Sequence, residues 1–134
     1  MTLNIRVIAP DRTVWDANAE EVILPSSTGQ LGILTGHIPL LTALDIGVMR
    51  VRINKEWIPI VLLGGFAEVE NNKITILVNG AEELEDIDAE IAQRSLEEAS
   101  AVFAEATSNK AKIEATQNIR KAKARLQALA TVTT

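Results

Sequence analysis

Few side chains in this sequence could carry out covalent or acid–base chemistry. The chain has one histidine, His37, and no cysteine, which excludes thiolate nucleophiles, disulfides and cysteine-ligated metal centres. A Ser-His-Asp site would have to use His37, but the spacing around residues 35–39 marks no serine or aspartate as its partner. The acidic residues lie mostly at predicted turns and on one predicted helix, where solvation explains them. We therefore expect a protein that is not an enzyme and has no metal site.

Glycine-rich stretches could bind phosphate, but none here has the required residues. Residues 28–32 lack both the Gly-Lys-Ser/Thr ending of a phosphate-binding loop and the third glycine of a dinucleotide turn. Gly64 and Gly65 stand between two strand patterns, where glycine typically marks a bend or bulge. We interpret these glycines as structural.

Charge is the clearest chemical signal, because it is divided between two stretches. Residues 82–105 contain nine acids and one base, Arg94, whereas residues 110–134 contain six bases and one acid, Glu114. The six bases are Lys110, Lys112, Arg120, Lys121, Lys123 and Arg125. This division fits two solvated faces that attract each other, and it also fits a basic helix that leaves its partner for an acidic surface elsewhere. Charge alone leaves both interpretations open.

Length and composition limit the classes of protein that could position these residues. The 134 residues suit one domain, or a small domain with an appendage, and 47% hydrophobic content argues against disorder of the whole chain. The net charge of −5 argues against a nucleic-acid binder. No signal peptide is evident, and the apolar stretch at residues 57–67 is far short of the ~20 residues that a membrane helix needs. We expect a soluble protein.

The first part of the chain has the pattern of short β-strands. Residues 3–7 and 48–53 alternate apolar and polar side chains, as half-buried strands do. Asn71 and Asn72 tolerate positive φ and fit a hairpin turn between two apolar runs. Several short strands at close spacing predict a β-sandwich or barrel, and two facing sheets bury such strands best.

After residue 84 there is no glycine or proline, and the apolar spacing becomes helical. The two predicted stripes are Ala89, Ala92, Leu96, Ala99, Phe103 and Ala106, then Ala115, Ile119, Ala122, Leu126 and Leu129. Asp88 is the expected N-cap of the first helix, and residues 107–109 break the pattern and cap the second. So short a loop predicts an antiparallel hairpin. Alanine-rich stripes bury little area, so we expect this hairpin to be held weakly and to be able to open.

One long stretch, residues 29–43, carries the pattern Gly-x-Leu-Gly-Ile followed by Gly-His-x-Pro-Leu-Leu-Thr-Ala. It resembles the signature of the epsilon subunit of rotary (F-type) ATP synthases, and the resemblance covers essentially the whole chain. Shorter matching stretches are residues 64–67, 74–78 and 86–88. Residues 45–47 and 76–79 look closer to the chloroplast and cyanobacterial versions. The resemblance implies a ten-stranded β-sandwich docking domain over residues 1–84 and an antiparallel two-helix regulatory hairpin over residues 85–134.

The resemblance also implies a role in the central stalk of the synthase. The sandwich would dock on the gamma subunit and the c-subunit ring, with Gln30 and Leu31 facing the ring and His37 near gamma. The hairpin would extend to the alpha–beta head and inhibit ATP hydrolysis. The basic positions that match the family's second helix, and would meet an acidic segment of the beta subunit, are Arg120, Lys121, Lys123 and Arg125. The implied location is the cytoplasmic or stromal side of a thylakoid membrane, reached only through the complex; a bacterial plasma membrane is the alternative.

One departure from the family concerns ATP. Some bacterial relatives bind ATP on the folded hairpin through a pattern like Ile/Leu-Asp-x-x-Arg-Ala. Here Ile91 stands where that pattern has arginine, and Glu90 adds a negative charge that repels phosphate. We expect ATP binding to be weak or absent and predict no cofactor.

Other classes of function remain as alternatives. The main one is a non-catalytic β-sandwich protein-binding module whose helical tail recruits another acidic protein. An enzyme is disfavoured by the single histidine and the absence of cysteine. Nucleic-acid binding through the basic helix is disfavoured by the overall acidity and by only two tryptophans and two phenylalanines.

Overall fold

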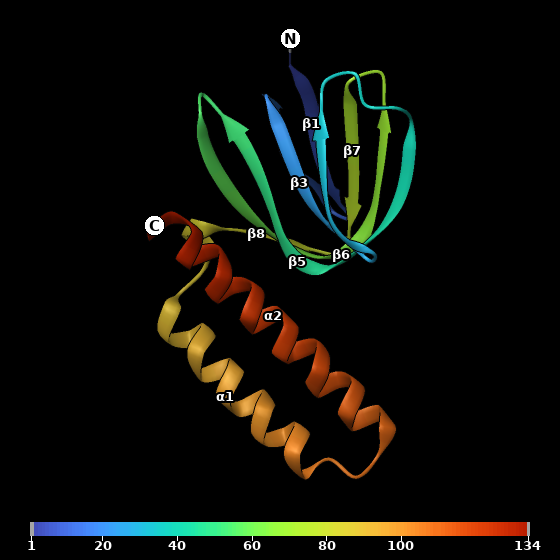
Figure 1. Ribbon diagram of the computed structural model, residues 1–134. Coiled ribbons are helices and arrows are strands. Elements are labelled where there is room, and N and C mark those ends of the chain that lie inside the picture. Colours follow the sequence, from blue (N-terminus) through green and yellow to red (C-terminus); the bar gives the residue numbers. More distant parts are fainter. Residues whose placement is uncertain (1, 134) are drawn as a thin grey trace.

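The computed structural model describes residues 2–133, with side chains as far as Thr131, and consists of a β-sandwich and a helical hairpin (Figure 1). The hairpin lies against one end of the sandwich, with α2 nearer to it than α1. The elements are β1 (Leu3–Ala9), β2 (Arg12–Ala19), β3 (Glu21–Ser26), β4 (Gly29–Leu34), β5 (Leu40–Ile53), β6 (Glu56–Glu70), β7 (Lys73–Val78), β8 (Ala81–Glu83), the 3₁₀ turn η1 (Leu84–Asp86), α1 (Ala89–Glu105) and α2 (Asn109–Thr133).

Hydrogen-bonded pairing follows the order β2-β1-β7-β6-β5-β3-β4, with β8 on β6. Only the β1–β7 pair is parallel among the described strands. β6 pairs with β8 through its first half and with β7 through its second half. The two halves of β6, together with the adjoining halves of β5, therefore belong to different layers of the sandwich.

The expected count of ten strands is wrong, because the described residues form eight strands. The difference comes from β5 and β6, which are 14 and 15 residues long and run through both layers. Both bend near Gly64 and Gly65, whose φ angles of 86° and 152° are open mainly to glycine. Counting each bent strand as two gives the ten of the expectation. The predicted bend at these glycines is confirmed.

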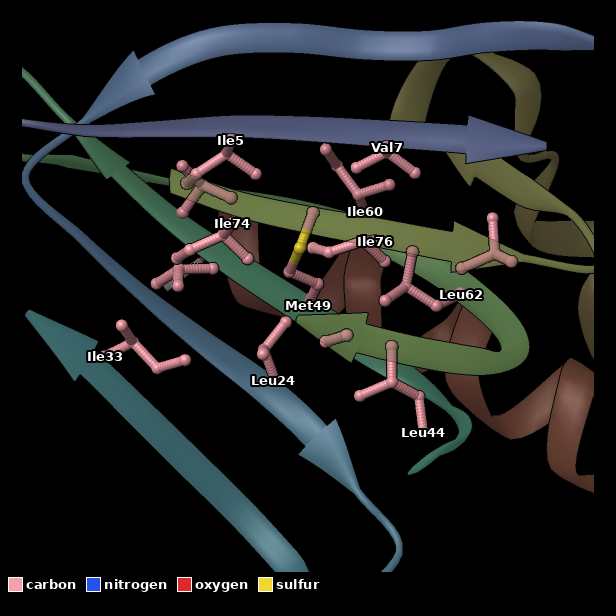
Figure 2. Packing of buried hydrophobic residues seen from close by; sticks show 14 of the residues in the cluster. Ile5, Val7, Leu24, Ile33, Leu44, Met49, Ile60, Leu62, Ile74 and Ile76 are labelled. Carbon is pink, nitrogen blue, oxygen red and sulfur yellow. The ribbon is translucent and has the colours of Figure 1, made fainter. Parts of the chain in front are cut away.

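The main core lies between the two layers (Figure 2). Alternation along each strand sends every second side chain inward, so Met49 and Ile76 are fully buried. The large buried side chains include Leu3, Ile5, Leu24, Ile33, Met49, Ile60, Leu62, Ile74 and Ile76. All of the buried residues in this cluster come from β1 to β7. The sandwich core is therefore complete without any helical residue.

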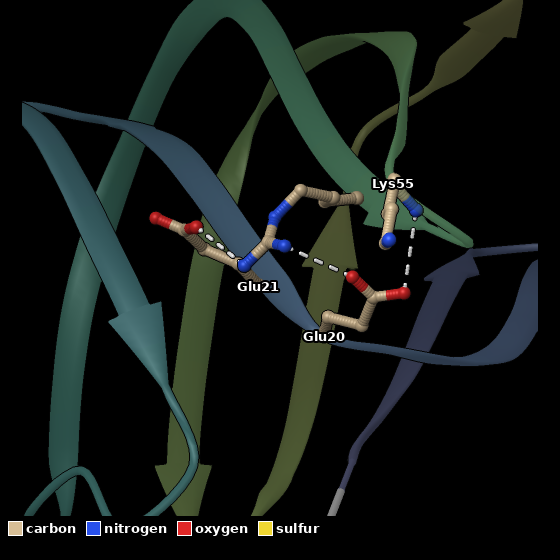
Figure 3. Close-up of polar contacts among 4 residues, drawn as sticks. Glu20, Glu21 and Lys55 are labelled. Atoms are coloured by element: carbon tan, nitrogen blue, oxygen red, sulfur yellow. Dashed lines mark hydrogen bonds and ion pairs between the residues drawn. The ribbon is translucent and has the colours of Figure 1, made fainter.

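Two tight turns join β5 to β6 and β6 to β7. Asn71 and Asn72 have φ of 51° and 62°, which confirms the predicted hairpin turn, and Asn54 and Lys55 form a second turn of the same kind. Beside the second turn, Arg52 pairs with Glu20 at 3.0 Å and Glu21 at 3.1 Å, and its guanidinium lies 5.8 Å from the Trp57 ring. Figure 3 shows Glu20 also accepting a hydrogen bond from the backbone of Lys55. These contacts tie the start of β3 to the turn between β5 and β6.

The helices begin where the sequence predicts. The Asp88 carboxylate accepts the Ile91 N–H at 3.0 Å, which confirms it as the N-cap of α1, and Ser108 Oγ accepts the Ala111 N–H at 3.1 Å at the start of α2. Ala92 and Ala99 of α1 are buried in the hairpin, as predicted, whereas Phe103 is 43% exposed. In α2 the predicted positions Ala115 and Ala122 are buried, and so are Ala124 and Ala128, which the predicted stripe omits.

Candidate functional site

The contact between hairpin and sandwich is small and made by short side chains. Val48 of β5 and Val61 of β6 point away from the main core and form a second buried cluster with Ala124 and Ala128 of α2. Partly buried side chains at its margin are Ile46, Leu63, Leu84 and Ile87. We call these eight residues the alanine seam. Because alanine buries little apolar area, the seam holds the hairpin far more weakly than the main core holds the two layers.

Arg125 is the strongest polar link between the two parts. Its Nε and Nη2 each donate to one carboxylate oxygen of Glu82 on β8, both at 2.7 Å. The side chains are 27% and 22% exposed, so water screens this bidentate pair only in part. The hydrogen bond to Glu82 raises the pKa of Arg125, so the guanidinium stays charged. This partner lies 43 positions away in the chain, and sequence reasoning did not find it.

The other basic residues of the predicted inhibitory set have a different environment. Arg120 and Lys123 are exposed, and Lys121 is half-buried in the groove between the helices beside Glu98 and Glu114. Of the four basic residues in this set, only Arg125 forms an ion pair within 4.0 Å in the part of the chain that the structure describes. The attraction between acidic α1 and basic α2 therefore acts at longer range than direct pairing.

The residues predicted to contact the ring and gamma do not form one cluster. Gln30 and His37 lie at opposite ends of β4, and the Gln30 Oε1 accepts a hydrogen bond from Arg50 at 3.2 Å. Leu31 is half-buried and packs against the main core, so only part of it faces solvent. His37 lies in the loop after β4, with its Nδ1 2.7 Å from the Ile38 carbonyl oxygen.

This loop is held by the neighbouring hairpin turn. The backbone N–H of Gly36 donates to the Asn72 side-chain oxygen at 2.7 Å, and the His37 N–H donates to the Leu34 carbonyl at 3.2 Å. The loop therefore has a defined shape and presents Ile38, which is 74% exposed.

Sequence reasoning missed an exposed apolar face on the second layer. Phe66 of β6 pairs with Leu77 of β7 and Ala43 of β5, and Leu41 lies two residues before Ala43 on the same face of β5. Leu41 is 70% exposed, Phe66 58% and Leu77 53%. The hairpin packs on the other layer, so it leaves this face uncovered. The signal in the sequence was a break in alternation at each of these positions: Leu41 follows Leu40, Phe66 precedes Ala67, and Leu77 stands between Ile76 and Val78.

A pocket at the junction of the two parts contains the stretch that resembles the family's ATP motif. It is lined by Glu82, Asp86, Ile87, Asp88, Ile91, Ala92 and Arg125. Three carboxylates stand beside one cation here, and Glu82 already occupies that cation. Such a pocket disfavours a polyphosphate through like-charge repulsion.

The fold and these surfaces define a two-part protein in which a β-sandwich carries a helical hairpin on a small apolar contact. A family model described as the beta-sandwich domain of the ATP synthase delta/epsilon chain matches residues 2–84. The chain is 72% identical to the chloroplastic ATP synthase epsilon chain of Pyropia yezoensis over 133 residues, covering 99% of each chain. It is 63% identical to the ATP synthase epsilon chain of Thermosynechococcus vestitus over 131 residues, covering 96% of this chain and 95% of that one.

The chain therefore belongs to the ATP synthase epsilon chain family. Solved structures agree on the fold. A chain of the Euglena gracilis mitochondrial ATP synthase, in a structure of its OSCP, F1 and c-ring, matches with a TM-score of 0.84 at 23% identity. That match covers 96% of this chain and 81% of the other. None of the described helices is long and apolar enough to cross a membrane.

Proposed function

We propose that this chain is the central-stalk epsilon subunit of an F-type ATP synthase. Its sandwich joins the gamma rotor to the c-ring during proton-driven synthesis, and its hairpin restrains ATP hydrolysis; the subunit itself is not catalytic. The observation that carries the proposal is the contrast between a self-contained sandwich core and a hairpin resting on the alanine seam. Only a weakly held hairpin can change position while the sandwich stays docked.

The exposed apolar face is the best candidate for the gamma contact. A soluble domain rarely leaves side chains such as Leu41, Phe66 and Leu77 exposed side by side unless a partner covers them. Gln30, with the exposed part of Leu31, would meet the polar loops of the c-ring, and His37 would lie near gamma. Because Gln30 and His37 are at opposite ends of β4, one sandwich can hold two partners at once.

A single substitution tests the gamma contact. Phe66→Glu should weaken binding to a purified alpha–beta–gamma head by at least about tenfold, because it places a charge in an apolar interface. Val102→Glu on α1, a residue that is also exposed, is the matched control and should bind normally. Equal binding by both variants would argue against this face as the contact.

The inhibitory role is assigned to the basic surface of α2, formed by Arg120, Lys121 and Lys123, with Arg125 available once the hairpin leaves the sandwich. An acidic segment on the head would attract this surface, and salt should weaken that attraction. The hairpin must bind the head better than it binds the sandwich, since only differential affinity shifts the population.

ATP hydrolysis by the purified alpha–beta–gamma head tests this role. The full chain should inhibit, and a version truncated after Glu83 should bind with little inhibition. In the full chain, Arg120→Glu with Lys123→Glu should relieve inhibition, whereas Lys110→Glu with Lys112→Glu changes the same charge elsewhere on α2 and should not. Equal inhibition by the full and truncated chains would assign the inhibition of ATP hydrolysis to the sandwich instead of the hairpin. No binding by either would favour the alternative, a sandwich protein-binding module with a helical tail.

We also propose that ATP binds weakly or not at all. Ile91 supplies no cation, and the Glu82 carboxylate already pairs with Arg125. Isothermal titration of the full chain should therefore show no micromolar affinity for ATP, and such an affinity would overturn the proposal.

The proposed location is the thylakoid membrane, on its stromal or cytoplasmic side, through the assembled complex. The named relatives support this, because one is a chloroplastic epsilon chain and another is the epsilon chain of the cyanobacterium Thermosynechococcus vestitus. Fractionation should recover the chain with membranes and release it when the head is stripped.

A further inference from the structure

Arg125 is one of the four basic residues assigned to the inhibitory surface, yet in this structure one edge of its guanidinium is already bound to Glu82. Two of its nitrogens donate to the two oxygens of Glu82 at 2.7 Å, and the pair is about three-quarters removed from solvent. A bidentate guanidinium–carboxylate pair of this kind is both strong and geometrically specific.

The pair joins the two parts of the molecule. Glu82 lies on β8, where it pairs with Val61 of β6, and Val61 is itself in the alanine seam. Arg125 lies next to Ala124, on the turn of α2 that rests on the sandwich. The ion pair therefore sits beside the apolar contact and closes the same junction.

We propose that Glu82 is an internal lock that holds the hairpin against the sandwich by occupying Arg125. We call the arrangement with the hairpin against the sandwich the closed form. In it, the Glu82 carboxylate takes the place of the acidic surface on the head. Arg125 therefore cannot pair with Glu82 and contact the head at the same time. The regulatory half of this inference rests on the proposed function, but the lock itself is a property of the chain alone.

Two features indicate that the Glu82–Arg125 pair supplies a large part of the stability of the closed form. The buried apolar part of the junction consists of two valines and two alanines, a much smaller area than the main core buries, so one charged pair is a large share of what holds the two parts together. No other ion pair within 4.0 Å joins helix and sandwich among the described residues. Removing the lock should therefore raise the open fraction about tenfold, as expected for losing charged hydrogen bonds in a partly screened site.

The lock can be measured on the full chain in solution. Because the chain has no cysteine, spin labels on Thr13→Cys and Gln117→Cys report the distance between sandwich and α2. Glu82→Gln should shift this distribution toward long distances, whereas Glu56→Gln, an exposed glutamate on β6 without an ion pair in the described structure, should not. Glu82→Arg combined with Arg125→Glu should restore the short distance, which also shows that the fold survives the changes. A wild-type distribution for Glu82→Gln would overturn the proposal.

Competition for Arg125 has its own signature in the hydrolysis assay. Glu82→Gln and Arg125→Gln should both open the hairpin, but Glu82→Gln should inhibit the head at severalfold lower concentration, because only it leaves Arg125 free to bind. Equal potency of the two open variants would overturn the competition. If the hairpin opens in both variants and no chain inhibits the head, the result would support the lock and overturn the proposed inhibitory role of the hairpin.

Discussion

The sandwich buries leucine, isoleucine, valine and methionine, whereas every buried side chain of the two helices, as far as the structure describes them, is an alanine. A fully buried large aliphatic side chain contributes about 1.5–3 kcal/mol, and alanine contributes much less. The sandwich therefore has a core of its own, and the hairpin rests on it through a much smaller apolar contact. Separate cores are what the proposed function requires, because one part can then stay attached while the other changes position.

The largest predicted effect tests the strength of the sandwich core. Ile76→Ala removes a fully buried side chain between the layers and should lower the free energy of unfolding by about 2–5 kcal/mol. Ala115→Gly in the hairpin, also buried, should cost only about 1 kcal/mol and should affect the helices alone. Urea unfolding can be followed by tryptophan fluorescence, which reports on the sandwich because Trp15 and Trp57 lie on β2 and β6, and by circular dichroism, which reports on the helices. Similar losses in both signals for both variants would mean that the parts unfold as one.

The second prediction concerns the bend that creates the two layers. In Gly65→Ala the added Cβ would lie 2.0 Å from the Leu77 carbonyl oxygen, at a φ of 152°. The backbone must shift, so we expect a loss of about 2–4 kcal/mol in sandwich stability. In Gly80→Ala the nearest atom is the flexible tip of Leu63 at 3.1 Å, and the loss should be smaller. Thermal unfolding of the two variants makes the comparison, and a larger loss for Gly80→Ala would contradict it.

A smaller effect is expected at the start of α1. Asp88→Ala removes the N-cap and should destabilise that helix by about 1 kcal/mol, while leaving the sandwich unchanged. Amide hydrogen exchange should quicken across α1 and stay constant in β1 to β7. Glu97→Ala, on an exposed face of the same helix, serves as the control. Faster exchange in the sandwich after Asp88→Ala would show that the two parts are coupled.

The smallest effect depends on pH, at the link between the parts. A hydrogen bond with Glu85, then desolvation and the charges of Glu85 and Asp86, raise the pKa of Glu83 above 4.5, against an opposing effect of Arg12. The folded chain holds this proton more tightly than the unfolded chain, so the stabilisation is present below pH 4.5 and is lost as pH rises through the raised pKa.

Glu83→Gln stays neutral and should therefore gain stability relative to the natural chain as pH rises from about 4 to about 7. Urea midpoints of both chains across that range measure the difference. A difference that stays constant with pH would show that Glu83 titrates alike in the folded and unfolded chains.

Much of the local structure follows from the sequence, because its causes are short-range. Asn71 and Asn72 make their turn through their own backbone preference, and Asp88 caps α1 through an atom three residues away. The period-two and helical patterns identified the two parts for the same reason. The family signature likewise lies in one continuous stretch, so the sequence was enough to recognise it.

Only the tertiary structure decided how these elements meet. Glu82 and Arg125 are 43 positions apart and become partners because α2 folds back onto β5 and β6, beside the β8 strand that carries Glu82. The division of β5 and β6 between layers depends on partners from β3, β7 and β8, and the role of Ala124 and Ala128 depends on which face of α2 meets the sheet. The sequence thus determined the elements, through interactions within a few residues. Packing between distant segments decided that Arg125 pairs with Glu82, and that the apolar face at Leu41, Phe66 and Leu77 stays exposed.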